Sequence, residues 1–319
     1  MSEDTQPRPQ TGRTASVGVD VDSLWHYFRI YGLPEDRTSN AAWRDGVSRF
    51  VELFAELGIP ATFYCVASDL EIPGNTERLQ ALVAAGHEIG NHTLNHRYDL
   101  TRMAPEERVV EVGQGRYRLE MAANAPVTGF RAPGYNTDAG LSADVRQTGH
   151  TYDSSVFPCV PYYTAKASVM GLMRLRGRES RSILGTPKVL LAPREPYRMA
   201  KGEPHARVSM GASDNEAGLA QFPVSVAAGV PMLGGAFTTL GGLGAELAAK
   251  AAVRMRQHLT IEFHALDLLS LREDNLNPAL AAQPDLRVPL AQKRAIFERV
   301  LKAVGERAQF VRLCDLKLD

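Results

Sequence analysis

The chain has 319 residues, and 36 basic residues balance 36 acidic ones, so its formal charge at neutral pH is zero. This balance excludes a generally basic nucleic-acid-binding protein, which needs a large positive excess, and we expect no nucleic-acid partner. Hydrophobic residues make up 44% of the chain, which is enough for an ordinary core. The three cysteines are widely spaced and odd in number, which indicates reduced thiols and a cytoplasmic protein.

Residues 1–14 are polar and lack the basic and apolar regions of a signal peptide, so we expect a disordered tail. Residues 15–319 show no linker and no internal repeat, and we expect one domain. The longest uncharged run, residues 217–245, contains seven glycines and two prolines, which is poor material for a transmembrane helix.

Short β-type runs alternate with amphipathic helical patterns from residue 16 onward. In residues 42–57, for example, the apolar side chains fall on one stripe, and Gly58 and Pro60 follow as stop signals. The expected strands are residues 16–21, 61–66, 87–90, 127–130, 152, 222–226, 259–263 and 310–313, and the expected helices are 42–57, 76–85, 105–123, 142–147 and 290–304. This alternation predicts an α/β fold of parallel strands, and seven or eight such units fit a barrel. Residues 155–221 break the rhythm and are predicted to be an insertion without strands.

Chemically capable side chains lie at the ends of five expected strands. In a (β/α) barrel the carboxyl ends of the strands converge on one mouth, where active sites lie. We therefore expect one shared site from the following residues: Asp20 with Asp22, His92, Arg131, Asp153 and His264.

Asp20 and Asp22 are two residues apart on a strand, so their carboxylates point to the same side. Two close carboxylates repel one another and favour a bound cation or a shared proton. Alternatively, the pair is a turn or cap that leads into Ser23.

His92 and His96 have the i, i+4 spacing that places two imidazoles on one face of a helical turn, within reach of one metal ion. By itself this spacing also arises by chance. Together with Asp22 it gives a set of two histidines and one carboxylate, which leaves coordination positions open for water and substrate.

Arg131 precedes a Pro133-Gly134 turn. Its guanidinium can hold a carboxylate bidentately, and the turn can direct a backbone N–H at a ligand, although a surface salt bridge is the ordinary alternative for such an arginine. His264 ends an apolar strand, where a histidine is a satisfied core residue, a catalyst or a third metal ligand.

These motifs occur in the order Asp-x-Asp, AGHEIGNHTLNH (residues 85–96), FRAPG (residues 130–134) and a late strand that ends in His. In this order they resemble the NodB-type polysaccharide deacetylases, carbohydrate esterase family four. The resemblance is good over residues 16–153 and weaker from residue 222 to the C-terminus. It implies a distorted (β/α) barrel of seven or eight strands, here with a large insertion. It also implies a divalent metal ion, usually zinc, and hydrolysis of an N-acyl group on a sugar.

The resemblance also assigns roles to residues. It implies Asp22, His92 and His96 as metal ligands, Asp20 as catalytic base, Arg131 as the residue that holds this base, the backbone N–H of Gly134 as oxyanion donor and His264 as general acid. Trp25 and Tyr135 are the aromatic candidates for substrate binding. The sequence departs from the family in its Asp-x-Asp spacing, in Gly134 where an aromatic residue is common, and in lacking a recognisable tryptophan motif.

The insertion is locally basic, because residues 166–207 contain ten basic and three acidic residues. Within residues 162–178, apolar and basic groups alternate at helical spacing, a pattern that suggests contact with a membrane surface or an anionic partner. Alternatively, this segment is a solvated basic helix packed on the barrel. The glycine-rich run 227–245 is either a lid at the barrel mouth or buried connecting structure. Together these segments suggest a substrate with phosphate and lipid, such as a polyprenyl-linked sugar, and peripheral contact with the inner membrane surface.

The leading hypothesis is therefore a metal-dependent N-deacetylase that acts on an amino sugar, either lipid-linked or anionic. An N-deformylase or another small-amide amidohydrolase on the same barrel is the first alternative. The others are a non-catalytic carbohydrate-binding barrel and a non-haem iron enzyme, which uses the same two-histidine, one-carboxylate set.

Overall fold

The computed structural model describes residues 12–175, 183–209, 211 and 217–318. The predicted disordered tail, residues 1–14, thus lies almost entirely outside the described residues, and its last residue, Thr14, begins the first strand.

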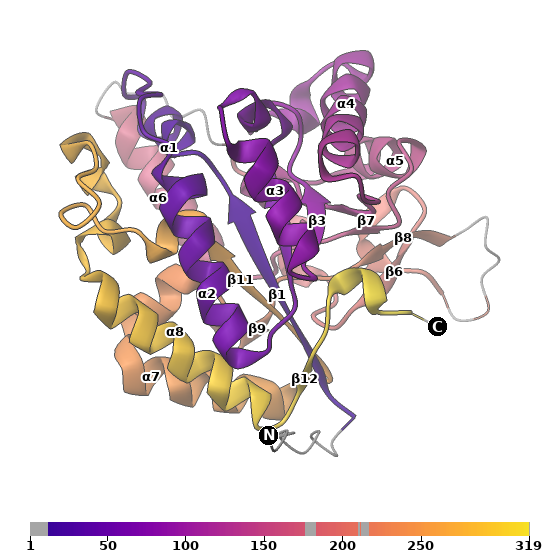
Figure 1. The fold of residues 1–319 in the computed structure, drawn as a ribbon. Coiled ribbons are helices and arrows are strands. Elements are labelled where there is room, and N and C mark those ends of the chain that lie inside the picture. The colour runs from indigo at the N-terminus through magenta and orange to yellow at the C-terminus, as the bar shows by residue number, and fades with distance from the viewer. Residues whose placement is uncertain (1–11, 176–182, 210, 212–216, 319) are drawn as a thin grey trace.

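A curled sheet of parallel strands forms the centre of the molecule (Figure 1). In spatial order its strands are β11 (His258–His264), β1 (Thr14–Val21), β2 (Ala61–Cys65), β3 (Glu88–Asn91), β4 (Gly129–Phe130), β5 (Tyr152–Asp153) and β8 (Ala217–Gln221). β12 (Gln309–Phe310) pairs with the start of β1. This arrangement confirms the distorted (β/α) barrel. The strands are buried almost continuously, as is typical of parallel strands with both faces covered.

The strand pairs differ greatly in length. β1 pairs with β11 over seven residues and with β2 over five, whereas β3–β4, β4–β5 and β5–β8 pair over two residues each. One side of the barrel is therefore held by long hydrogen-bonded ladders and the other by short ones.

Helices surround the sheet (Figure 1). They are α1 (Leu24–Ile30), α2 (Val47–Leu57), α3 (Asn75–Ala84), α4 (Pro105–Ala123), α5 (Ala139–Gln147), α6 (Val160–Leu175), α7 (Gly234–Met255) and α8 (Leu290–Gly305). The predicted stop of α2 is confirmed, because Gly58 adopts the left-handed conformation with φ of 65°. α7 packs against α8, and α4 packs against both α3 and α5.

Large side chains fill the barrel interior, and glycines on the neighbouring strands leave room for them. A Cβ atom on Gly90 would lie 2.5 Å from the Tyr64 ring, and one on Gly129 would lie 2.1 Å from the Tyr152 hydroxyl. The Tyr152 hydroxyl donates to Glu88 Oε1 at 2.7 Å. These contacts fill the barrel interior away from the carboxyl ends of the strands, and the open space lies at the mouth.

The predicted strand 222–226 is wrong as a single element. β8 ends at Gln221, and an irregular segment with a short hairpin, β9 (Val226–Ala227) and β10 (Val230–Pro231), follows. This segment joins β11: Ser225 N–H donates to Thr260 O at 3.0 Å and Glu262 N–H donates to Met232 O at 2.9 Å. The barrel is thus closed by irregular backbone pairing.

The insertion contains strands, contrary to the prediction. β6 (Tyr197–Ala200) and β7 (Glu203–Arg207) form an antiparallel hairpin that extends the sheet beyond β8. The four and five residues of these strands are too short to show a clear period in the sequence. The helices α1 and α7 were also not predicted. α7 begins in the glycine-rich run, and Gly241 interrupts it with φ of 70°.

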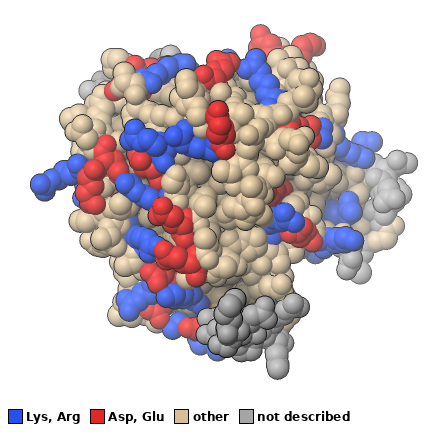
Figure 2. Space-filling model, viewed as in Figure 1, with Lys and Arg blue, Asp and Glu red and all other residues tan. Residues whose placement is uncertain are grey.

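Charged side chains of both signs are interspersed over the face that carries α2 and α8 (Figure 2). Arg294 on α8 pairs with Glu56 on α2 at 2.6 Å and with Glu298 at 3.7 Å. Such exposed pairs each contribute little to stability. Within the described ranges, the structure contains no helix with the length and hydropathy needed to span a membrane.

Candidate active site

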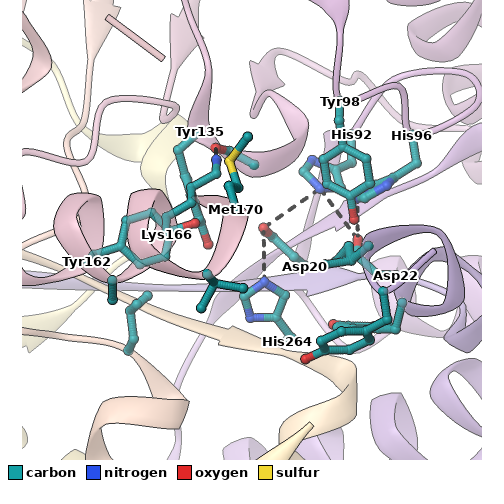
Figure 3. Close-up of a pocket in the computed structure, with 17 residues that line it drawn as sticks. Asp20, Asp22, His92, His96, Tyr98, Tyr135, Tyr162, Lys166, Met170 and His264 are labelled. Carbon is teal, nitrogen blue, oxygen red and sulfur yellow. Dashed lines mark hydrogen bonds and ion pairs between the residues drawn. The ribbon is translucent and has the colours of Figure 1, made fainter. Parts of the chain in front are cut away.

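A cavity of about 330 Å³ opens at the carboxyl ends of the barrel strands (Figure 3). Asp20 and Asp22 reach it from the end of β1, and His264 reaches it from the end of β11. Helices α1 and α6 supply an aromatic and aliphatic wall. The lining residues of this wall are Tyr27, Ile30, Tyr31, Tyr162, Ala165, Val169 and Met170, with Tyr98 and Leu233 from loops.

Asp22, His92 and His96 converge as the sequence predicted. Asp22 Oδ1 lies 3.4 Å from His92 Nε2 and 3.2 Å from His96 Nε2, and all three side chains are buried. His92 Nδ1–H donates to Arg131 O at 2.7 Å, which leaves Nε2 as a lone-pair donor toward the site. Asp22 Oδ1 is buried without a hydrogen-bond partner among the described residues. This donor set fits a divalent cation.

The two histidines do not sit on a helical turn, so that part of the prediction is wrong. Thr93 and His96 have left-handed backbones with φ of 72° and 53°. The turn is held by side chains, because Thr93 Oγ1 accepts from His96 N–H at 3.0 Å and Asn91 Oδ1 accepts from Thr93 N–H at 2.9 Å. A β-branched residue is strained in this conformation, and such strain persists only where the surroundings impose it.

Helix α4 presses on this turn through Gly115. A Cβ atom at Gly115 would lie 2.8 Å from Leu94 N and 2.8 Å from Thr93 C, which are backbone atoms that cannot move aside easily. The glycine therefore permits the close approach that shapes the turn between the two histidines.

Arg131 is a fully buried partner of Asp20, which rules out the surface salt bridge. Its Nη1 donates to Asp20 Oδ1 at 2.7 Å, while Nε and Nη2 donate to Ser154 O at 3.1 Å and Ser154 Oγ at 2.9 Å. The guanidinium also lies over the Tyr64 ring, 4.0 Å from its centroid. Burial alone would raise the pKa of Asp20, but the positive charges of Arg131, His92 and His264 together lower it, which favours the ionised carboxylate.

His264 lies across Asp20 from the two metal-site histidines, with Nε2 4.0 Å from Asp20 Oδ2. Its backbone N–H donates to Asp267 Oδ2 at 2.8 Å. Burial would lower the pKa of His264, but the Asp20 and Asp267 carboxylates raise it to about 9. An imidazolium therefore faces the cavity at neutral pH.

Of the remaining predicted residues, some line the cavity and others lie outside it. Gly134 and Tyr135 line the cavity, whereas Asp153 lies outside it and accepts from Gln221 Nε2 at 3.1 Å. Trp25 is not among the lining residues: it is buried against His26, and Arg29 and Arg37 cover its ring at 4.2 and 3.9 Å. Substrate binding by Trp25 stays a prediction without a supporting contact.

Sequence reasoning missed Glu262 and Lys166. Glu262 is fully buried in β11, and burial raises its pKa to about 8. Its position two residues before His264, in an otherwise apolar strand, was the available signal. Lys166 on α6 lines the cavity and donates to Gly134 O at 3.0 Å, and burial lowers its pKa to about 8.

Comparison with known proteins shows what part of this chain is similar to. A sequence model described as polysaccharide deacetylase matches residues 37–152, the part of the chain that contains both histidines and Arg131. Over these residues the chain is similar to the polysaccharide deacetylase family.

A curated relative agrees with this similarity. The peptidoglycan deacetylase of Helicobacter pylori is 28% identical over 154 residues, which are 46% of this chain and 52% of that protein. The chain thus spans about half the length of this curated relative.

Solved structures support the fold over nearly the whole chain. A Mycobacterium smegmatis structure, named as a polysaccharide deacetylase, superposes with a TM-score of 0.61 at 16% identity, over 97% of this chain and 92% of that one. The structure of Puue allantoinase superposes with a TM-score of 0.58 at 14% identity, over 98% and 92%.

A buried cluster packs behind His96, one of the candidate metal ligands. The ring of His26 lies 4.3 Å from the His96 ring, and Asp69 Oδ1 faces His26 Nε2 at 3.7 Å. Asp69 Oδ2 accepts from Ser23 Oγ at 2.6 Å and from Trp43 Nε1 at 3.4 Å, which fixes the carboxylate. The His26 ring therefore limits the orientations open to the His96 ring.

Proposed function

We propose that the protein is a metal-dependent hydrolase that removes an N-acyl group, in the simplest case acetyl, from an amino sugar. One observation carries the proposal: an ionised Asp20 and a protonated His264 face the same cavity beside the Asp22, His92 and His96 donor set. Base, acid and metal ligands are the three parts that hydrolysis of an amide requires.

Zinc is the metal that we propose, since one carboxylate and two imidazoles leave open positions in its coordination shell. One divalent cation held by Asp22, His92 and His96 would polarise the acyl carbonyl and lower the pKa of a water molecule.

The side chains then divide the proton transfers. Asp20, held ionised by Arg131, accepts a proton from the attacking water. His264 donates a proton to the leaving amine, which departs as a neutral group. The backbone N–H of Gly134 faces the developing oxyanion and stabilises its charge.

The cavity wall supports a substrate that is apolar at one end and anionic near the acyl group. α1 and α6 contribute mainly aromatic and aliphatic side chains, and Lys166 is the single Lys or Arg among the described lining residues. Burial lowers the pKa of Lys166, and among the described residues it has a carbonyl partner but no carboxylate partner. A phosphate or carboxylate on the substrate would balance this ammonium group. A lipid-linked amino sugar phosphate meets both demands.

The outer side of α6 supports contact with the inner membrane surface of the cell, which we propose as the working location. Val169, Leu172 and Leu175 are 53%, 48% and 86% exposed, and Arg174 lies among them. Arg176 and Arg178, which continue the basic pattern, lie outside the described residues.

A small-amide amidohydrolase is the second candidate. The cavity volume of about 330 Å³ is at the small end for ligand sites, which favours a compact amide over a polysaccharide chain. The allantoinase structure superposes over nearly the whole chain, and at 14% identity this similarity shows a shared fold. Such a fold is compatible with hydrolysis of a small amide.

The activity test measures two kinds of product from the zinc-loaded protein: acetate or formate from the acylated substrates, and allantoate from hydrolytic ring opening of allantoin. The substrates are chitin oligosaccharides, N-acetylglucosamine 1-phosphate, an undecaprenyl-linked N-acetylglucosamine and allantoin, with Asp20→Asn as the inactive control. Acyl release from an amino sugar that stops with Asp20→Asn supports the proposal. Hydrolysis of allantoin alone would select the second candidate, and no release from any of them would reject both.

A separate test addresses the membrane. Sedimentation with phosphatidylglycerol-containing vesicles should show binding that weakens with added salt. Since a basic residue near an anionic surface contributes about 1 kcal/mol, Arg174→Glu should weaken binding by at least about fivefold. Lys201→Glu in the β6–β7 turn, far from α6 in Figure 1, is the matched charge reversal and should leave binding unchanged. Absence of binding at low salt would remove the membrane from the proposal.

A further inference from the structure

Glu262 is a buried carboxyl group that the proposed reaction does not use. It is fully buried in β11, and its Oε1 accepts a hydrogen bond from the Tyr135 hydroxyl. Its Oε2 lies 3.6 Å from Arg131 Nη1 and makes no hydrogen bond within the described part of the chain. Burying a carboxyl group costs free energy unless it has a hydrogen-bonding partner. Tyr135 is that partner for Glu262, so this contact stabilises the buried group.

The Tyr135 end of this contact lies in a strained turn. Gly134 and Tyr135 are both left-handed, with φ of 67° and 61°. An aromatic residue is strained in this conformation, so the surroundings must hold it. The Tyr135 ring packs against Phe157 and Tyr162, with centroids 5.3 and 5.8 Å apart, but these contacts do not fix the direction of the hydroxyl.

The Glu262 end lies in the strand that carries the acid. Glu262 and His264 are on the same side of β11, and they stand opposite Gly18 and Asp20 of β1. Gly18 leaves the space that this cluster needs, because a Cβ there would lie 2.8 Å from Arg131 Nη1. The Tyr135–Glu262 bond therefore ties the turn that contains Gly134 to the ladder that sets the spacing of base and acid.

We propose that Tyr135 and Glu262 form a strut, a single buried hydrogen bond that fixes the Gly134 N–H relative to Asp20 and His264. Both are positioning residues, since neither needs to touch the substrate's acyl group for this role. The inference rests on the proposed function in one respect, the use of the Gly134 N–H as the oxyanion donor.

The kinetic test breaks the strut from either end. Tyr135→Phe and Glu262→Met remove the hydrogen bond, whereas Glu262→Gln keeps an acceptor and serves as the conservative rescue. The probe is 4-nitrophenyl acetate, an activated acetyl ester whose hydrolysis passes through the same kind of oxyanion and needs no sugar recognition. Tyr152→Phe is the matched control, because it deletes another buried Tyr–Glu bond, to Glu88, deeper in the barrel.

A full oxyanion donor is worth about 10²–10³ in kcat, so a displaced one should cost about 10–100-fold. We expect this loss in Tyr135→Phe and in Glu262→Met, with KM and zinc affinity, measured by chelator competition, changed less than twofold. The double variant Tyr135→Phe/Glu262→Met should be no slower than the slower single variant, since both remove one interaction. Glu262→Gln and Tyr152→Phe should keep kcat within about threefold of the parent protein. Full activity of Tyr135→Phe, multiplied losses in the double variant, or an equal loss in Tyr152→Phe would each overturn the strut.

A second readout does not depend on activity. Amide hydrogen exchange in residues 131–137 should accelerate in Tyr135→Phe and stay unchanged in Tyr152→Phe, because a local anchor is lost only in the first. Unchanged exchange in Tyr135→Phe would overturn the strut even if the parent protein hydrolyses no ester. Conversely, the expected exchange and ester results without acyl release from any amino sugar would reject the sugar assignment alone.

Discussion

The Arg131–Asp20 pair allows the sharpest test of the site's energetics. Both side chains are buried, and Arg131 also donates to the carbonyl and the hydroxyl of Ser154. Arg131→Met fills a similar volume but leaves the Asp20 carboxylate without its cation. Breaking a buried pair in this way costs about 3–5 kcal/mol, because one charge stays buried and uncompensated. We expect a loss of that size in the free energy of unfolding.

The opposite substitution should cost less. In Asp20→Asn the guanidinium keeps its Ser154 contacts, and Glu262, 3.6 Å from Arg131, can ionise and replace the lost negative charge. The expected loss is about 1–3 kcal/mol, the cost of a broken hydrogen bond to a charged group. The double variant Asp20→Asn/Arg131→Met removes both charges of the pair. Its loss in the free energy of unfolding should therefore be about 1–3 kcal/mol smaller than the sum of the two single losses.

Urea unfolding of the metal-free proteins at pH 7, followed by circular dichroism, measures all four free energies. Equal slopes with urea concentration would show that the same folded and unfolded states are compared. A loss for Arg131→Met no larger than that for Asp20→Asn, or strict additivity in the double variant, would refute this account of the pair.

Three further predictions concern the metal site and the acid. His92→Ala should abolish stoichiometric zinc binding, measured by metal analysis, while circular dichroism shows an intact fold; retained zinc would remove His92 from the ligand set. Gly115→Ala should destabilise the protein by about 1–3 kcal/mol and weaken zinc binding, because its Cβ would overlap backbone of residues 93–94, whereas Gly113→Ala meets only the Thr148 side chain and should be milder. In the metal-free protein, histidine NMR should give His264 a pKa near 9, and its contribution to stability should be present below pH 6.5 and lost as the pH rises through 9. Zinc should lower this pKa, since a nearby dication disfavours the imidazolium.

Much of the barrel could be predicted because its signals are local. The helix expected at 42–57 is present as a π-helical turn, Ala42–Gly46, followed by α2. The strands at 61–65 and 258–264 lie within about one residue of their expected bounds. The rule that strand ends converge then brought Asp20, Asp22 and His264 together, and they do share the cavity.

The parts that could not be predicted depend on contacts distant in sequence. The turn between His92 and His96 is left-handed at two residues, and Gly115, about twenty residues later, is what lets a helix press against it. α7 contains glycines that disfavour a helix locally, and its packing against α8 overrides that preference. The partner of Glu262 is a tyrosine on another strand-end loop, which no spacing rule could indicate.

The unequal ladders of the barrel suggest how such a scaffold can change its substrate. The long ladders join β11, β1 and β2, and Asp20, Asp22 and His264 lie at the ends of two of these strands. The two-residue ladders lie toward β8, where the insertion enters and α6 forms the wall of the cavity. Replacing residues 155–221 with a segment of another length would therefore disturb few backbone hydrogen bonds of the catalytic half. Reaction chemistry and substrate choice are thus mechanically separable in this molecule, and exchange of this one segment is a practical route to redesigning its specificity.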